Sequence, residues 1–335
     1  MTVIRRNILE SDDARDRYLA AVVELNRANT GITVGRLYEQ LRQLVPLLRI
    51  YGEDQELSVW DVFVIWHYLA MQIVTPPLEP LRNLAHGGPG FLPWHRLFLI
   101  RLEEQLQRVM DADTALPYWD WAAHGELSET AQREHQLWGD HYLGESRGEV
   151  TSGPLGDMRL RIEDRGDALY SVEERRLVRN AGVETPKLPT IADLNWALED
   201  ENYDASPWSA AAESFRNKVE GWLQRPPTPE DPELENSQLH NRVHVWVAGD
   251  MFPGTSPNDP VFYLNHCNED RIWERWMAKH GRKYQPTVAH ADAPVGHRLD
   301  DIMVTLLGEP LRPADVLDAS SWYTYDDLSV PDPPP

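Results

Sequence analysis

The chain has 335 residues, of which 54 are Asp or Glu and 32 are Lys or Arg, so its formal net charge at pH 7 is −22. This charge excludes nucleic acid and anionic membrane surfaces as partners, because both bind clusters of Lys and Arg. The 13 Trp and 12 Tyr residues need a core in which to be buried, which excludes a largely disordered chain.

A single cysteine, Cys267, excludes an intramolecular disulfide and any zinc or iron–sulfur site built from several cysteines. No stretch approaches the roughly 18 uninterrupted apolar residues of a membrane helix. Arg5 and Arg6 resemble the start of a twin-arginine signal, but acidic residues follow where such a signal is apolar. We therefore expect no signal peptide, and a location in the cytoplasm or outside the cell after export with a partner.

The predicted elements are mainly helices. Ser11 followed by acidic residues indicates a helix that begins at residue 12, because a serine side chain caps the first turn. Apolar spacing and the positions of proline and glycine predict further helices at 35–48, 56–73, 93–110, 214–222, 237–248 and 260–280. The helix at 56–73 is apolar enough to be buried. Between residues 111 and 210 we expect loops with short helices, and no strand can be placed there.

These elements predict a mainly α fold, a four-helix bundle decorated by long loops. No repeat of fixed period divides the sequence, so we expect a single domain over 1–335. Its core is expected to end near residue 285, with a C-terminal extension over 286–335. The proline-rich end of this extension, 329–335, is expected to be frayed.

Six of the twelve histidines form two sets of three, each on a predicted pair of helices: His67, His86 and His95, then His240, His244 and His266. The spacing of four between His240 and His244 places both imidazoles on one helix face, one turn apart. A lone histidine on an apolar face is more often a core residue than a ligand, but a helix bundle can direct grouped histidines into one interior site. The other six are expected on the surface: His124, His135, His141, His280, His290 and His297.

Two sets of three imidazoles favour a pair of transition-metal ions. Neutral imidazole binds zinc, copper, nickel and iron. No carboxylate accompanies either set at ligand spacing, which disfavours a dizinc hydrolase or a di-iron site. The general order of metal affinities favours copper, and three ligands per ion would leave positions open for O2.

The sequence around these histidines contains two extended motifs. FLPWHRLFL lies at 91–99, and LHNRVHVWV at 239–247 is followed by SPNDPVFYLNHCNEDRIW at 256–273. They resemble the first and second copper signatures of tyrosinases, most closely the bacterial, Streptomyces-type enzymes. The similarity continues through 116–121, 215–222 and 312–318. It implies a tyrosinase-like domain with a type 3 dicopper centre, in which His67, His86 and His95 bind one copper and His240, His244 and His266 bind the other.

The resemblance also implies an activity. It is the oxidation of small phenols with O2 as co-substrate, by o-hydroxylation of monophenols and oxidation of o-diphenols to o-quinones. Glu220 and Asn241 match residues that hold a water thought to deprotonate the phenol, whose pKa of about 10 requires a base or a metal at neutral pH. Streptomyces-type relatives depend on a small companion protein, so a copper-loading partner is expected.

Four further residues are expected near the ligands. Phe262, Val245 and Asn265 are expected at the substrate, and Asp270 is expected to orient His266 from outside the metal shell. Asn265 stands where the family usually has a second histidine, so copper binding is expected to persist while substrate preference changes. The alternatives are an o-aminophenol oxidase with the same centre and a hemocyanin-like protein that binds O2 without turnover.

Overall fold

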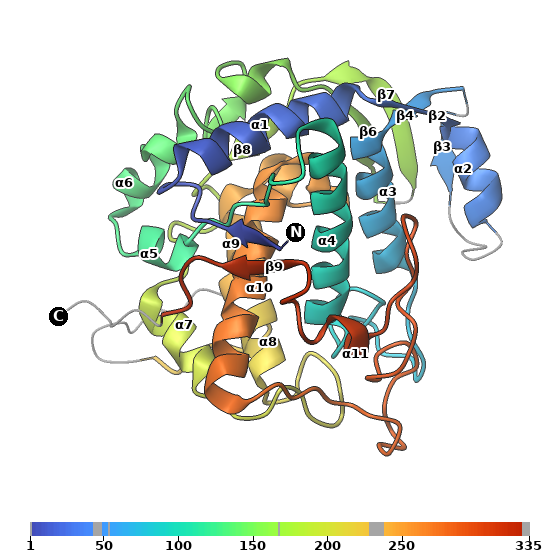
Figure 1. Ribbon diagram of the computed structural model, residues 1–335, viewed down its shortest axis with the longest axis vertical. Helices are drawn as coiled ribbons and strands as arrows, with labels where there is room; N and C mark the ends of the chain where they lie inside the picture. The colour runs from blue at the N-terminus through green and yellow to red at the C-terminus, as the bar shows by residue number, and fades with distance from the viewer. Residues whose placement is uncertain (1, 43–48, 53, 167, 228–237, 330–335) are drawn as a thin grey trace.

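Four helices form the centre of the computed structural model, which describes residues 2–42, 49–52, 54–166, 168–227 and 238–329. They are α3 (Val59–Gln72), α4 (Phe91–Val109), α9 (Leu239–Val247) and α10 (Val261–His280). Helix α10 packs against α4 and α9 (Figure 1). Phe63 and Trp66 of α3 meet Phe98 of α4 edge to face, with ring centroids 5.3 Å and 5.0 Å apart. The predicted mainly α fold around four helices is confirmed.

Capping residues determine where the N-terminal helices begin. The Ser11 hydroxyl accepts a hydrogen bond from the N–H of Ala14 at the start of α1 (Asp12–Arg27), as predicted. Ser58 and Asp61 form a reciprocal capping box at the start of α3. Residues 56–58, predicted as helix, therefore belong to strand β4 (Glu56–Ser58). Helix α2 (Val34–Leu41) covers the first part of the predicted helix at 35–48, and residues 43–48 lie outside the described part of the chain.

Short strands surround the helical core. Strand β2 (Asn29–Thr33) pairs antiparallel with β4, and β5 (Arg147–Glu149) pairs antiparallel with β8 (Val178–Asn180). A three-stranded sheet has the order β3 (Ile50–Tyr51), β7 (Leu169–Arg175), β6 (Leu160–Asp164). The strands between residues 111 and 210 were not predicted, because their sequences, such as LYSVEER in β7, are short and rich in charge.

The described chain also contains several short helices. They are α5 (Trp121–Gly125), α6 (Glu129–Arg133), α7 (Ile191–Leu198), α8 (Phe215–Glu220) and α11 (Pro313–Val316), with single 3₁₀ turns at Gln136–Trp138, Pro154–Asp157, Gly249–Met251 and Ser256–Asn258. Within the described residues, no helix is both long and apolar enough to cross a membrane.

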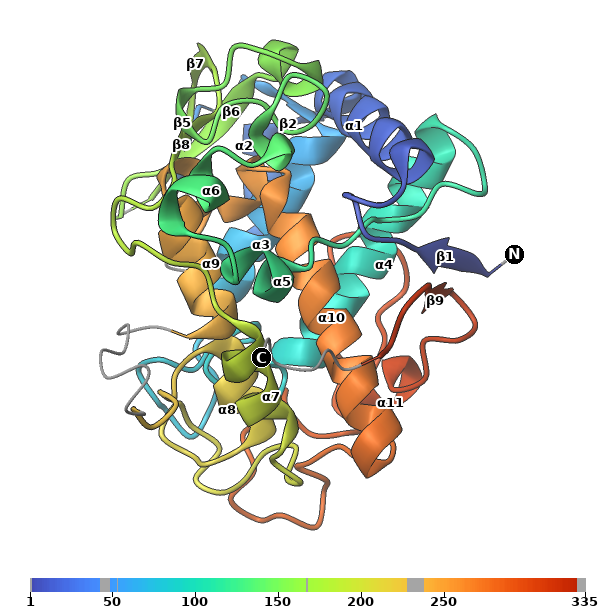
Figure 2. The ribbon, with the colours of Figure 1, turned by 90° about the vertical axis from the view of Figure 1, so that its left-hand side faces the viewer.

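The C-terminal segment is joined to the N-terminus and to α10. Strand β9 (Tyr323–Tyr325) pairs in parallel with β1 (Val3–Arg5), and both views show the two strands side by side (Figure 2). The hydroxyls of Tyr323 and Tyr325 each donate a hydrogen bond of 2.6 Å to Asp270 of α10. Residues 286–329 thus contribute to the packing of the core helices, and 330–335 of the predicted frayed end lie outside the described residues.

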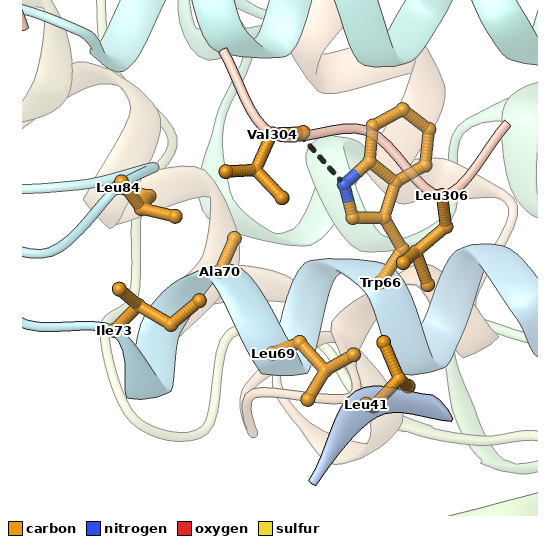
Figure 3. Close-up of a pocket in the computed structure, with 8 residues that line it drawn as sticks. All are labelled: Leu41, Trp66, Leu69, Ala70, Ile73, Leu84, Val304 and Leu306. Atoms are coloured by element: carbon orange, nitrogen blue, oxygen red, sulfur yellow. Dashed lines mark hydrogen bonds between the residues drawn. The ribbon is translucent and has the colours of Figure 1, made fainter. Parts of the chain in front are cut away.

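A small apolar pocket marks the outer face of α3. Figure 3 shows Trp66 and Ala70 of this helix extending toward Val304 and Leu306 of the C-terminal segment, while Leu69 lies toward Leu41. The Trp66 indole N–H donates a hydrogen bond of 3.3 Å to the Val304 carbonyl. All the residues that line this pocket are apolar, so it packs the segment against α3 and offers no group for chemistry.

Two of the six histidines predicted on the surface are buried. His124 accepts a hydrogen bond from the Trp119 indole on Nδ1, and its Nε2 lies 3.1 Å from the Gln132 carbonyl. His297 accepts from the N–H of Gly90 on Nδ1 and lies 3.0 Å from the Thr75 hydroxyl on Nε2. The surface prediction rested on the polar residues next to them in the sequence and is wrong. Both histidines can be buried because both ring nitrogens of each have hydrogen-bond partners inside the fold.

Candidate metal centre

Six histidines meet in the interior as two triads. In each triad, one nitrogen of every ring lies within 4.8 Å of the corresponding nitrogens of the other two. The first triad combines His67 of α3, His95 of α4 and His86 of the loop between them; the second combines His240 and His244 of α9 with His266 of α10. The groups predicted from the spacing are therefore brought together by the four core helices and one loop.

Hydrogen bonds orient most of these rings. Four of them place Nδ1 beside a neutral oxygen acceptor: His67 beside Gly254 O (2.8 Å), His95 beside Phe91 O (2.9 Å), His244 beside Met251 O (2.7 Å) and His240 beside Asn241 Oδ1 (2.9 Å). Each acceptor favours the tautomer that carries its proton on Nδ1. The Nε2 lone pair of each ring is then left to bind a metal.

The Nε2 atoms of His67, His95 and His244 are buried and have no hydrogen-bond partner among the described residues. In the second triad, the Nε2 atoms of His240 and His266 face each other at 3.3 Å. Buried nitrogens without partners, or with their lone pairs directed at one another, are unfavourable unless a cation lies between them. The donor set and its orphaned atoms thus fit a metal ion in each triad.

Burial keeps the six imidazoles neutral. Desolvation lowers the pKa of His67 to about 3 and that of His244 to about 4, although a backbone carbonyl raises each of them in part. It also lowers the pKa of the other four well below the usual value, and neighbouring histidines lower these values further. Protons therefore compete weakly with a metal at neutral pH.

The two triads adjoin each other over one aromatic ring. Phe262 of α10 is fully buried, and its ring centroid lies 4.9 Å from that of His67 and 4.1 Å from that of His266. It also lies 5.8 Å from the ring of His244. This packing fixes ligands of both triads relative to one another, so the two triads are adjoining parts of one site.

A cavity of about 510 Å³ opens onto the triads. His67, His86, His240 and His244 line it, together with Met71, Pro80, Leu81, Asn83, Trp222, Asn241, Val245, Phe252, Pro253 and Ser256. The walls are mostly apolar. His67 and His240 are 2% exposed, whereas Leu81 and Phe252 are at least half-exposed, so these histidines lie at the buried end of the cavity. A small aromatic molecule fits such a space.

The predicted substrate-contacting residues divide into two groups. Val245 and Asn241 line the cavity, each one position after a histidine of α9. Phe262 and Asn265 are fully buried and do not line it, contrary to expectation. Phe262 lies behind the imidazoles, and Asn265 is turned by about 100° from His266 around α10.

Asp270 does not orient His266 as expected. Its carboxylate accepts hydrogen bonds from Arg96, Arg5, Tyr323 and Tyr325 instead. The positive charges of Arg96 and Arg5 and the hydrogen bonds from the two tyrosines keep the pKa of Asp270 below its usual value in spite of burial. The acid that approaches His266 is its neighbour Glu269, whose Oε2 lies 3.0 Å from Nδ1 of the imidazole.

Glu220 contacts the loop that carries His86. Its Oε1 accepts a hydrogen bond of 2.6 Å from the N–H of Gly87, and its Oε2 accepts one of 2.9 Å from Arg216. Burial raises the pKa of this carboxyl, although Arg216 lowers it in part. A side chain at Gly87 would collide with the Leu81 carbonyl, and its φ of +66° favours glycine, so this close contact with Glu220 depends on the glycine.

Several residues of the site were not singled out from the sequence. Trp222 lines the cavity and stood in the motif at 215–222 without an assigned role. The carbonyls of Met251 and Gly254 orient two ligands, but a backbone acceptor leaves no signal in the sequence. Glu269 could have been found by its spacing, because a residue three positions after His266 shares its helix face.

Comparison with known proteins decides the family. The family model described as the common central domain of tyrosinase matches residues 57–279. The chain belongs to the tyrosinase family.

Similar tyrosinase-family proteins cover most of the chain. A tyrosinase of Streptomyces glaucescens is 33% identical over 335 residues, which are 97% of this chain and 99% of that protein. The grixazone synthase of Streptomyces griseus subsp. griseus is 36% identical over 301 residues, 82% of this chain and 92% of that protein. A solved structure of polyphenol oxidase from Thermothelomyces thermophila shares the fold, with a TM-score of 0.66 and 19% identity over 97% of this chain and 89% of that one.

As a member of the tyrosinase family, the chain is an oxidoreductase that oxidises phenols with O2 at a binuclear copper centre. The two histidine triads fit that centre.

Proposed function

We propose that the first triad holds one copper and the second triad the other, and that this centre serves both the o-hydroxylation of monophenols and the oxidation of o-diphenols. One observation carries the proposal. Buried Nε2 atoms without partners belong to both triads, and they converge beside a cavity large enough for a phenol. When bound, the copper pair supplies the electron transfer between the phenol and O2.

The protein's part is to receive the ring and to exclude water around it. Val245, Trp222 and Phe252 present apolar surface to the cavity, whose inner end is formed by the histidines. A phenol that enters with its hydroxyl group first leaves its apolar edge against these walls. Asn241 holds the Nδ1–H of His240, which keeps that ligand in the tautomer that binds metal through Nε2.

We further propose that Glu220 and Asn241 hold a water that takes the proton of the incoming phenol. Each oxygen of Glu220 already accepts one hydrogen bond, but a carboxylate has about four acceptor sites and can hold a water as well. The raised pKa of Glu220 makes it a better proton acceptor than an exposed carboxylate. Asn241 lies at the cavity wall, where it can reach both water and substrate.

We also propose the partner and the location that the sequence predicts. A companion protein would deliver copper and accompany the chain during export. Supporting it, the imidazoles of His67, His95, His240 and His266 are only 1–3% exposed, so free copper ions have limited access. Copper uptake by the metal-free chain, measured with and without proteins of its source cells, tests the delivery. Uptake from a copper chelate that is equally fast and complete in both samples would contradict it.

Activity assays separate the alternatives. The copper-loaded protein should form o-quinones from a monophenol and from its o-diphenol, and the metal-free protein should form neither. An o-aminophenol oxidase would instead prefer an o-aminophenol to the matching catechol by a wide margin in kcat/KM. A carrier would bind O2 reversibly and form no quinone. Asn265 is proposed to affect this preference from behind the ligands, so Asn265→His should shift the rate ratios at an unchanged copper count.

A further inference from the structure

Glu269 is a buried acid that has no Lys or Arg partner within the part of the chain that the structure describes. Its side chain lies on α10 and is 1% exposed, and neither carboxylate oxygen has a hydrogen-bond partner among the described residues. Burial, together with the neighbouring acids Glu220 and Asp270, raises the pKa of Glu269 well above its usual value. The cations of this region serve other acids, since Arg96 and Arg5 pair with Asp270 and Arg216 pairs with Glu220. An unpaired carboxylate at such a position is strongly unfavourable.

His266 offers the missing partner. Oε2 of Glu269 lies 3.0 Å from Nδ1 of His266. The N–H direction is not aligned for a hydrogen bond, and Nδ1 has no other acceptor among the described residues. Each group is therefore the other's available partner, and a small rotation of either side chain would join them.

This arrangement distinguishes His266 from the other ligands. Where Nδ1 of another triad histidine has an acceptor, that acceptor is a neutral carbonyl or amide oxygen. His266 alone faces a carboxylate among the described residues. A hydrogen bond to a carboxylate makes an imidazole more basic and a stronger donor to its metal.

We propose that Glu269 is a positioning residue that accepts the Nδ1–H of His266 and thereby strengthens the binding of Cu²⁺ at the second triad relative to the first. The inference rests on the proposed assignment of the triads to two coppers. The copper ion, acting through the His266 imidazole, would then balance the negative charge of the Glu269 carboxylate. The two copper sites are consequently unequal, with the second favouring the oxidised ion.

Copper titration tests the inference. Competition with a chelator measures the Cu²⁺ affinity of each site in the wild type, Glu269→Gln and Glu269→Leu. We expect one of the two affinities to fall about 10-fold to 100-fold in both variants, with the other unchanged. The reduction potential of the weakened site should rise, because loss of the negative charge favours Cu⁺.

Stability of the metal-free protein separates this role from a structural one. Because Glu269 makes no hydrogen bond to the described residues, its replacement should leave the urea midpoint of metal-free Glu269→Gln and Glu269→Leu unchanged or higher. Glu274→Gln is the matched control, because Glu274 lies on the same helix but is paired with Arg96 and Arg282. It should lower the urea midpoint and leave both copper affinities at the wild-type values.

Three results would overturn the inference. They are unchanged copper affinities in both Glu269 variants, an equal fall at both sites, or a urea midpoint lowered as in Glu274→Gln. The wild type and His266→Ala distinguish these failures from a failure of the proposed function. If the wild type binds two coppers and His266→Ala binds one, the assignment of the triads stands whatever the Glu269 variants show. If the wild type binds none, the assignment itself fails.

Discussion

His95 and His266 belong to different triads, yet their imidazole rings are stacked, with centroids 4.1 Å apart and planes inclined by 10°. They come from α4 and α10, the two longest described helices, which pack against each other. The contact makes the two triads one structural unit. Side chains that support one triad should therefore influence the other.

Phe262 should be the most sensitive support of this unit. Its buried ring contacts histidines of both triads, so Phe262→Ala would leave a cavity beneath them. We expect the free energy of unfolding of the metal-free protein to fall by about 3–5 kcal/mol, and the binding of both coppers to weaken. Urea unfolding and copper analysis measure the two effects. The control Phe252→Ala removes a ring that is 64% exposed and should change stability by no more than about 0.5 kcal/mol. Equal losses in the two variants would show that Phe262 has no special supporting role.

Val245 should limit the size of the substrate. It lines the cavity beside His244, and a larger side chain there would occupy space that the phenol needs. Val245→Phe should lower kcat/KM for catechols by about 10-fold to 100-fold without loss of copper. The control Val183→Phe enlarges a valine that is 60% exposed and lies outside the cavity, and it should keep wild-type kinetics. Wild-type kinetics in Val245→Phe would place the substrate elsewhere.

Glu220 should matter more for monophenols than for diphenols. If it holds the water that takes the phenol proton, Glu220→Gln should lower the monophenol rate by about 10²-fold to 10⁴-fold and the diphenol rate much less. The amide keeps an acceptor for the N–H of Gly87, so the loop of His86 and the copper count should be preserved. Steady-state rates on a matched phenol and catechol provide the test. An equal fall of both rates would limit Glu220 to supporting the loop.

His124 should make the fold sensitive to acid independently of copper. Burial, together with the neighbouring His135, lowers the pKa of His124 from 6.5 to about 3. Protonation would also place a second N–H against the Trp119 indole N–H, which donates to Nδ1. Below pH 6.5, His124 is therefore protonated in the unfolded chain but not in the folded chain. The free energy of unfolding falls as the pH falls toward 3. Between pH 7 and pH 5 this group should contribute a loss of about 2 kcal/mol.

Unfolding of metal-free protein at the two pH values measures that contribution. His124→Gln is expected to be less stable than the wild type at pH 7, but to lose about 2 kcal/mol less on going to pH 5. The same substitution at the exposed His141 should leave the pH dependence unchanged. The linkage would be refuted if His124→Gln and the wild type lost equal stability over this interval.

The sequence predicted features that depend on residues close together along one helix. It did not predict features that depend on contacts between distant segments. The spacing of His240 and His244 on one helix, and the capping serine before α1, were readable because they are local. The burial of His297 was not, because it depends on the C-terminal segment returning to Gly90 at the start of α4.

The pair Glu269 and Asp270 shows the same limit within a single turn of helix. Both residues lie close enough along α10 to reach His266, and spacing alone does not distinguish Glu269 from Asp270, which was the predicted one. The structure reverses the choice because Arg96 of α4 and Arg5 of β1 take up the Asp270 carboxylate. Partners from other elements decide which of two adjacent acids is left to face the ligand.

Copper analysis of two single-ligand variants tests the central claim most directly. His95 belongs to the first triad and His244 to the second, so each substitution removes one ligand of a different ion. The account predicts about two coppers per chain in the wild type, and about one in His95→Ala and in His244→Ala, with phenol oxidation abolished in both. Two tightly bound coppers in both variants, or catechol oxidation at the wild-type rate in either, would contradict it.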